Sequence, residues 1–142
     1  MNIARHIALI DELCYRPFVA EHSVSEVEES GPGYHLVVLE SSQGDFETRA
    51  ATVEQFEKYR DALYEPLAAR WDDTDPWNLQ TTLLRMAQEE IPDPWALLSQ
   101  RARVAYLWEA AGTGRWVVLV VADRDEADDV KLLAVVTEID PP

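Results

Sequence analysis

Tryptophans beside carboxylates are the residues of this chain whose types and spacing could do chemistry. Three of its five tryptophans stand in one stretch, each with an acid one or two positions away. An indole face attracts cations, and a neighbouring carboxylate strengthens that attraction, so the pattern favours a surface for a basic protein or a quaternary ammonium group. The alternative is that these indoles are core residues, since two of them continue apolar stripes. The group comprises Trp71, Asp72, Asp73, Asp75, Trp77, Asp93 and Trp95.

Histidine supplies a second hypothesis. His22 and His35 fall on predicted strands, where either could be the polar group of a pocket between sheet and helices. Tyr34 or Trp108 would form the aromatic wall of that pocket. No two histidines have a metal-ligand spacing such as H-x-x-x-H, and Cys14 is the only cysteine. We therefore expect no metal site.

Other motifs do not satisfy the chemistry that they suggest. The acidic loop 123–129 is similar in composition to a calcium loop, but the EF-hand register places Asp128 where glycine is needed and Ala134 where glutamate is needed. Gly112–Gly114 precedes a strand, whereas a phosphate loop precedes a helix. Paired carboxylates are too frequent in so acidic a chain to indicate acid–base catalysis. We predict no cofactor and no catalytic residues, and a binding protein rather than an enzyme.

The net charge of −15 restricts the partners. It is spread evenly, with 13 acids against 6 bases in residues 1–70 and 14 against 6 in residues 71–142. Because 47% of the residues are hydrophobic, the charge must coat a folded domain rather than extend a disordered one. Such an acidic coat repels phosphate, which argues against nucleic acid and anionic membranes. It would attract a basic or cationic protein surface.

Length and composition predict one soluble globular domain over residues 1–142. A lone cysteine cannot form an internal disulfide, which fits the reducing cytoplasm. The apolar stretch near the N-terminus is interrupted by Asp11 and Glu12, unlike a signal peptide. The strongly apolar run 116–122 is too short to span a bilayer as a helix. The sequence leaves the oligomeric state open.

The first half of the chain predicts a helix, three strands and a second helix. Asn2 is a suitable cap for a helix that ends before Pro17. A turn is expected at 30–33 and another at 42–45. Thr52 and Gln55 form a capping-box signature for a helix that reaches Trp71 and should kink or split at Pro66. The predicted strands are Phe18–Val24, Tyr34–Glu40 and Phe46–Ala50.

An internal echo then relates two segments. Asp75-Pro76-Trp77-Asn78-Leu79 is followed 18 residues later by Asp93-Pro94-Trp95-Ala96-Leu97. Asp caps helices and Pro favours their first position, so the echo predicts two helix starts. The first helix would extend to about Glu90, and the second would be short.

The last third predicts strands again, at Val104–Trp108, Trp116–Val121 and Leu132–Ile139. The second of these is apolar on both faces, which indicates a central strand covered on both sides. The fold class is therefore α+β, in the order α-βββ-αα(α)-βββ, with antiparallel β-meanders and helices packed on one side. The sequence leaves open whether the two meanders form one sheet or two.

These observations favour a non-enzymatic, acidic protein-interaction module, such as an adaptor, a chaperone-like protein or an immunity-type regulator. The alternative is a small-molecule-binding α+β domain, with or without weak catalysis, whose pocket lies between sheet and helices.

Overall fold

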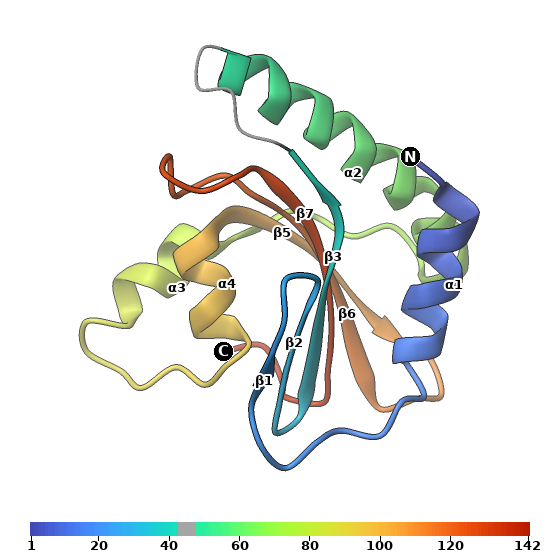
Figure 1. Ribbon diagram of the computed structural model, residues 1–142. Coiled ribbons are helices and arrows are strands. Elements are labelled where there is room, and N and C mark those ends of the chain that lie inside the picture. Colours follow the sequence, from blue (N-terminus) through green and yellow to red (C-terminus); the bar gives the residue numbers. More distant parts are fainter. Residues whose placement is uncertain (43–47) are drawn as a thin grey trace.

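The computed structural model describes residues 1–42 and 48–142, with four helices and seven strands among them (Figure 1). A helix, strands, helices and strands again give the α+β class that the sequence predicts. None of the helices in these residues is long and apolar enough to cross a bilayer. In chain order the elements are α1 (Ile3–Leu13), β1 (Ser23–Val24), β2 (Glu28–Gly31), β3 (Tyr34–Ser41), α2 (Arg49–Trp71), β4 (Trp77–Asn78), α3 (Leu79–Arg85), α4 (Trp95–Arg101), β5 (Ala102–Ala110), β6 (Arg115–Ala122) and β7 (Lys131–Thr137).

The seven described strands form one antiparallel sheet in the order β1-β2-β3-β7-β6-β5-β4. The pairing of β3 with β7 joins the N-terminal strands to the C-terminal ones. It extends from Tyr34 opposite Thr137 to Ser41 opposite Lys131. The two groups of strands are therefore halves of one sheet.

Strand β6 is buried on both faces, as its unbroken apolar sequence predicts. Val117, Leu119 and Val121 belong to one core, whereas Val118 and Val120 belong to another on the opposite face. Successive side chains of a strand point to opposite faces, so alternate residues enter different cores. The prediction of a central strand covered on both sides is confirmed.

Helices cover both faces of the sheet, and the prediction of helices on one side is wrong. Figure 1 shows α1 and α2 on one side and α3 and α4 on the other. A sheet whose central strands are apolar on both faces needs a cover on each. Helices α1 and α2 contribute Ile10, Leu13, Phe56, Leu63 and Leu67 to the core on their side of the sheet. Helices α3 and α4 contribute Leu79, Trp95 and Leu98 to the core on the other side.

Helix α1 begins and ends where the sequence predicts. The side-chain oxygen of Asn2 accepts a hydrogen bond from the backbone N–H of Arg5 at 3.0 Å, which caps the helix. Beyond its end, the guanidinium of Arg115 donates to the carbonyl oxygens of Leu13 and Arg16, at 2.7 Å each. These bonds attach the end of α1 to the start of β6.

The first strands differ from the prediction. Only Ser23–Val24 of the predicted strand 18–24 is paired, and β2 is formed instead by residues that the pattern assigns to a connection and a turn. The sequence of β2 is polar because this strand lies near the edge of the sheet, so no apolar pattern predicts it. Gly31 allows the Tyr34 ring to lie close to the backbone of β2, since a Cβ at Gly31 would lie 2.6 Å from Cε1 of Tyr34.

The start of α2 also differs. Residues 43–47, which carry most of the predicted turn 42–45 and the start of the predicted strand Phe46–Ala50, lie outside the described residues. Arg49 and Ala50 are helical, so the end of that predicted strand is wrong. Thr52 is not the cap, because its hydroxyl lies inside the helix and donates to the carbonyl oxygen of Thr48 at 3.1 Å.

Helix α2 is not split at Pro66. Proline removes one helical hydrogen bond, but Leu63 and Leu67 on either side are fully buried and keep the helix on the sheet. The helix ends after Trp71, where Asp72 has a φ of 74°.

The echo does not mark two equivalent helix starts. In the first copy Trp77 and Asn78 form β4, and α3 begins at Leu79 with the Asn78 side chain accepting from the N–H of Gln80 at 2.9 Å. In the second copy α4 begins at Trp95 without a side-chain cap. Neither aspartate caps a helix, and α3 ends at Arg85 rather than near residue 90. Asparagine, which is as good a cap as aspartate, takes that role in the first copy.

Candidate functional site

The tryptophans of the predicted partner surface do not share a face. Trp95 is fully buried, and its indole N–H donates to the carbonyl oxygen of Ile139 at 3.0 Å. The ring of Trp77 packs against it with centroids 5.4 Å apart, in the core under α3 and α4. Trp71 packs against the other core, and the guanidinium of Arg70 lies 5.5 Å from its ring centroid.

The acids of that predicted surface are exposed, but they do not surround one aromatic group. Asp72, Asp73, Asp75 and Asp93 all lie at the surface. The contribution of Asp72 to the fold comes from its backbone, whose carbonyl oxygen accepts from the indole N–H of Trp108 at 2.9 Å. The structure therefore places Trp71 on one side of the sheet and Trp77 and Trp95 on the other.

The four residues of the alternative pocket are separated too. Tyr34 lies on the α4 side of β3, and its hydroxyl is 3.4 Å from Nδ1 of His22. His35 follows Tyr34 and points to the α1 side, where Phe18 stacks on it with centroids 5.1 Å apart. Trp108 belongs to the core under α1 and α2. The structure brings His22 and Tyr34 together, but not the set of four.

His35 has both ring nitrogens occupied. Nδ1 is 2.9 Å from the hydroxyl of Ser30, and Nε2 donates to the carbonyl oxygen of Pro17 at 3.1 Å. The residue is 2% exposed, and its burial lowers the pKa of the imidazole below the ordinary value of 6.5. The neutral ring therefore joins the α1–β1 connection to the sheet.

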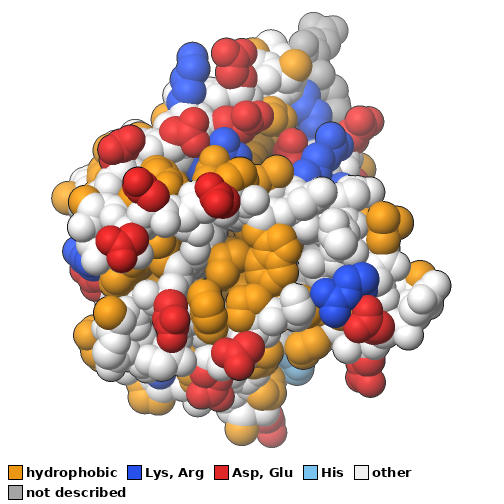
Figure 2. All heavy atoms as spheres, turned by 180° about the vertical axis from the view of Figure 1, so that it is seen from behind, with side chains coloured by type: hydrophobic (Ala, Val, Ile, Leu, Met, Phe, Trp, Pro, Cys, Tyr) orange, Lys and Arg blue, Asp and Glu red, His pale blue; other side chains and the backbone are white. Residues whose placement is uncertain are grey.

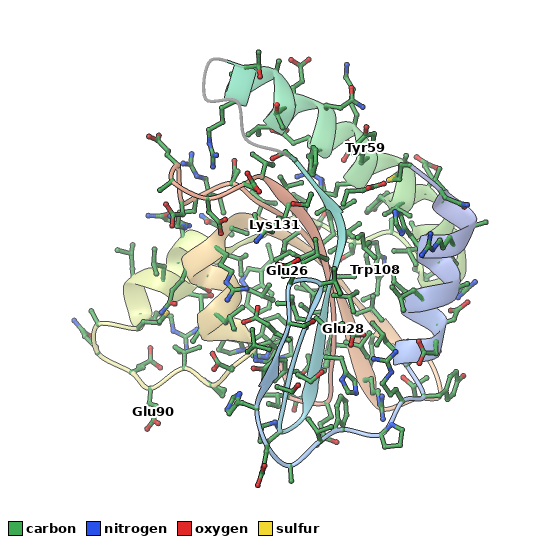
Figure 3. All side chains as sticks on the ribbon, in the orientation of Figure 1. Glu26, Glu28, Tyr59, Glu90, Trp108 and Lys131 are labelled. Carbon is green, nitrogen blue, oxygen red and sulfur yellow. The ribbon has the colours of Figure 1, made fainter. Side chains whose placement is uncertain are left out.

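A hollow that the sequence does not single out lies on the α4 side of the sheet. It has a volume of about 270 Å³, and its walls come from the β1–β2 hairpin, the end of α4 and the loop 123–130. Its floor is apolar, formed by Leu36, Val38, Ala122 and Leu133. In Figure 3, Glu26 and Lys131 lie around its position between α4 and the hairpin. We call it the acidic hollow.

Carboxylates dominate the lining of the acidic hollow. Six acidic and two basic residues line it, but the Glu28 carboxylate points to the opposite face of the sheet and binds Arg16 at 2.8 Å. Five carboxylates against two bases leave a formal charge of −3. Both bases are paired with acids of the same lining, Arg101 with Glu29 and Lys131 with Asp128. The five carboxylates are those of Glu26, Glu29, Asp125, Asp128 and Asp129. The lining can therefore attract a further cation and seat its apolar part on the floor.

The Arg101–Glu29 pair is the most buried charged feature of the hollow. Both terminal nitrogens of the guanidinium donate to the carboxylate, one of them at 3.1 Å. This bond raises the pKa of Arg101, and the Glu29 side chain is 17% exposed. Burial and the nearby Asp93 and Glu29 carboxylates raise the pKa of the adjacent Tyr34 hydroxyl. Glu29 is thus committed to Arg101, whereas Glu26 faces solvent at the hairpin.

Hydrogen bonds hold both acidic walls. Arg49, at the start of α2, donates to the carbonyl oxygens of Asp123, Asp125 and Asp128 at 3.2, 2.8 and 2.7 Å. On the hairpin, the hydroxyl of Ser25 accepts from the N–H of Glu28 at 3.1 Å. The carboxylates of the hollow therefore stand on anchored backbone.

A larger and differently charged hollow lies beside α1. It has a volume of about 420 Å³ and is lined by Arg5, His6 and Glu40 among others. Nε2 of His6 lies 3.3 Å from the Glu40 carboxylate. One acid against two basic side chains gives this hollow none of the convergent negative charge of the acidic hollow.

Sequence reasoning missed Glu26, Glu29, Arg101 and Lys131 as site residues. Two acidic segments, 26–29 and 123–129, are visible in the sequence, but they lie about a hundred residues apart. Only the pairing of β2 with β3 and of β3 with β7 brings them to one hollow. Acidic runs are so common in this chain that neither segment stands out.

The face opposite to the view of Figure 1 shows no such convergence among the described residues (Figure 2). Figure 2 shows the face behind the view of Figure 1, where acidic side chains are scattered around a central group of hydrophobic ones. Within residues 1–42 and 48–142, no three His, Cys, Asp or Glu side chains are grouped so that they could hold a metal ion.

Comparison with known proteins finds no relative. No protein-family model matches the chain, and neither the curated proteins nor the solved structures contain a match.

Proposed function

We propose that this chain is a non-enzymatic interaction module that binds a basic segment of another protein in the acidic hollow. The observation that carries the proposal is the lining itself, an apolar floor under five carboxylates, with the two basic side chains of the lining already paired. A basic side chain can place its aliphatic part on such a floor while its charge meets the rim.

The acidic coat supports the same partner chemistry over a longer range. A net charge of −15 steers basic proteins towards the molecule and speeds their encounter with it. The net charge attracts basic proteins without specifying where they bind, and the acidic hollow is the proposed binding site. A pocket built on His22, Tyr34, His35 and Trp108 gains no comparable support, because these residues lie on two faces of the sheet.

A binding experiment with a defined probe tests the proposal. A short fluorescent peptide of mixed lysine and arginine is titrated with the protein and with the double variant Glu26→Gln/Asp128→Asn. Both substitutions keep the size of the side chain and remove a charge from the hollow. We expect the Kd to rise about tenfold, equivalent to about 1.4 kcal/mol.

A matched variant removes the same charge elsewhere. Glu65 and Glu90 are exposed, and Glu90 lies on the loop before α4, far from the hollow in Figure 3. Glu65→Gln/Glu90→Gln should change the Kd less than about twofold, because screened distant charges contribute little. Equal losses in the two double variants would show that only the coat binds, and the proposal would fail.

A further inference from the structure

Two cations already lie in the acidic hollow, and they contact carboxylates differently. Arg101 binds both oxygens of Glu29 through two guanidinium nitrogens. Nζ of Lys131 lies 3.7 Å from the nearer Asp128 oxygen, which is beyond hydrogen-bond distance. The same lining therefore holds a guanidinium at two points and an ammonium at none. The planar fork of arginine matches the two oxygens of a carboxylate, as the contact of Arg101 with Glu29 shows.

The space in the hollow suits one long side chain. Its volume of about 270 Å³ falls just below the range of about 300–1,000 Å³ that is usual for pockets of drug-sized ligands. Leu36, Val38 and Leu133 offer an apolar floor for the methylene stem of one residue. A folded element would not fit.

The carboxylates that are not bonded to Arg101 approach that space from two walls. Glu26 stands on the hairpin, whereas Asp125 and Asp128 stand on the loop that Arg49 anchors. A guanidinium has five donors in one plane and can bond to acids on two sides at once. An ammonium is more strongly hydrated and loses more when it leaves water.

We propose that the acidic hollow is an arginine-selective site, which takes the side chain of one arginine from the partner's basic segment and discriminates against lysine. The stem of that arginine lies on the apolar floor, and its guanidinium lies between Glu26 and the loop acids. Selectivity rests on the proposed function, because the arginine belongs to the basic segment that the hollow binds.

Peptides that differ only in the cation test this selectivity. An oligo-arginine and an oligo-lysine of equal length, each carrying the same dye, are titrated with the unmodified protein. We expect the arginine peptide to bind about tenfold more tightly. Because guanidinium binds acidic surfaces well in general, the preference must also depend on the hollow. In Glu26→Gln/Asp128→Asn it should fall to about twofold or less, whereas Glu65→Gln/Glu90→Gln should retain it.

The outcomes separate this inference from the proposed function. Equal affinity for the two peptides, with both weakened by the hollow variant, overturns arginine selectivity and leaves the basic-segment site standing. An arginine preference that survives in the hollow variant places the selectivity elsewhere and also overturns it. If neither peptide binds, both proposals fail.

Discussion

The imidazole of His35 is held by its neighbours in an uncharged state. The guanidinium of Arg115 lies 4.0 Å from the ring centroid of Phe18, and Phe18 stacks on His35 from the α1 side. Burial is the largest cause of the lowered His35 pKa, and the positive charges of Arg16 and Arg115 lower it further. A proton on this ring would be desolvated and would face two cations.

Protonation of His35 should therefore destabilise the fold. Its pKa is below 6.5 in the folded chain, so the unfolded chain takes up the proton first as the pH falls. The contribution of His35 to stability is complete above about pH 6.5 and decreases as the pH falls towards the folded pKa. Urea unfolding at several pH values should show a smaller loss between pH 7 and 5 in His35→Gln than in the unmodified protein. An NMR titration that places the His35 pKa at or above 6.5 would contradict this prediction.

At the scale of elements, α4 is fixed to the sheet by Trp95. The indole is fully buried, packs at an angle of 41° against the ring of Trp77 in β4, and donates to the carbonyl oxygen of Ile139 beyond β7. Helix α4, strand β4 and the segment after β7 thus meet on one side chain.

Replacing Trp95 should cost more stability than replacing its counterpart on the other face. Trp95→Ala leaves a large cavity and an unpaired carbonyl, and we expect a loss of about 3–5 kcal/mol in the free energy of unfolding. Trp71→Ala should cost less, because Trp71 is only partly buried. Urea denaturation measures both changes. A loss below about 1 kcal/mol for Trp95→Ala would mean that its indole is not a core residue.

Elements with strong local signals could be predicted from the sequence. The Asn2 cap and the apolar spacing give α1, and the unbroken run 116–121 gives β6 and its burial on both faces. Strand β2 has no apolar pattern, and β4 is two residues long, so tertiary pairing alone defines them. The aspartates of the echo predict two helix caps. In the first copy Asn78 is the cap instead, and in the second copy α4 begins at the buried Trp95 without a side-chain cap.

Local sequence patterns could not predict the candidate site, for a related reason. The residues of the tryptophan–acid group are close in sequence. The sheet nevertheless separates them, because Trp71 packs on one face and Trp77 on the other. Conversely, Glu26 and Asp128 meet only because the central strands pair. Long-range pairing assembles the hollow, and the sequence carries no local signal of it.

At the scale of the whole molecule, salt should have opposite effects on folding and on binding. The net charge of −15 repels itself in the compact state. Raising NaCl from about 0.01 to 0.15 M shortens the screening length from about 30 to 8 Å, so the free energy of unfolding should rise. Over the same range the Kd for a basic peptide should increase. Choline chloride should reproduce both effects at equal ionic strength. Stability that falls or stays constant with added salt would contradict the prediction.

The β3–β7 pairing also determines when the fold can be completed. Tyr34 finds its partner Thr137 about a hundred residues later, and β7 is the last described element of the chain. Until β7 arrives, β3 and β6 each have an open edge where the centre of the sheet should be, and their apolar sequences invite pairing with other chains. A chain cut before residue 131 would therefore consist of two separate groups of strands with unpaired, aggregation-prone edges, and it would not fold as a smaller version of the same domain. A single late strand converts an aggregation hazard into the most protected part of the molecule.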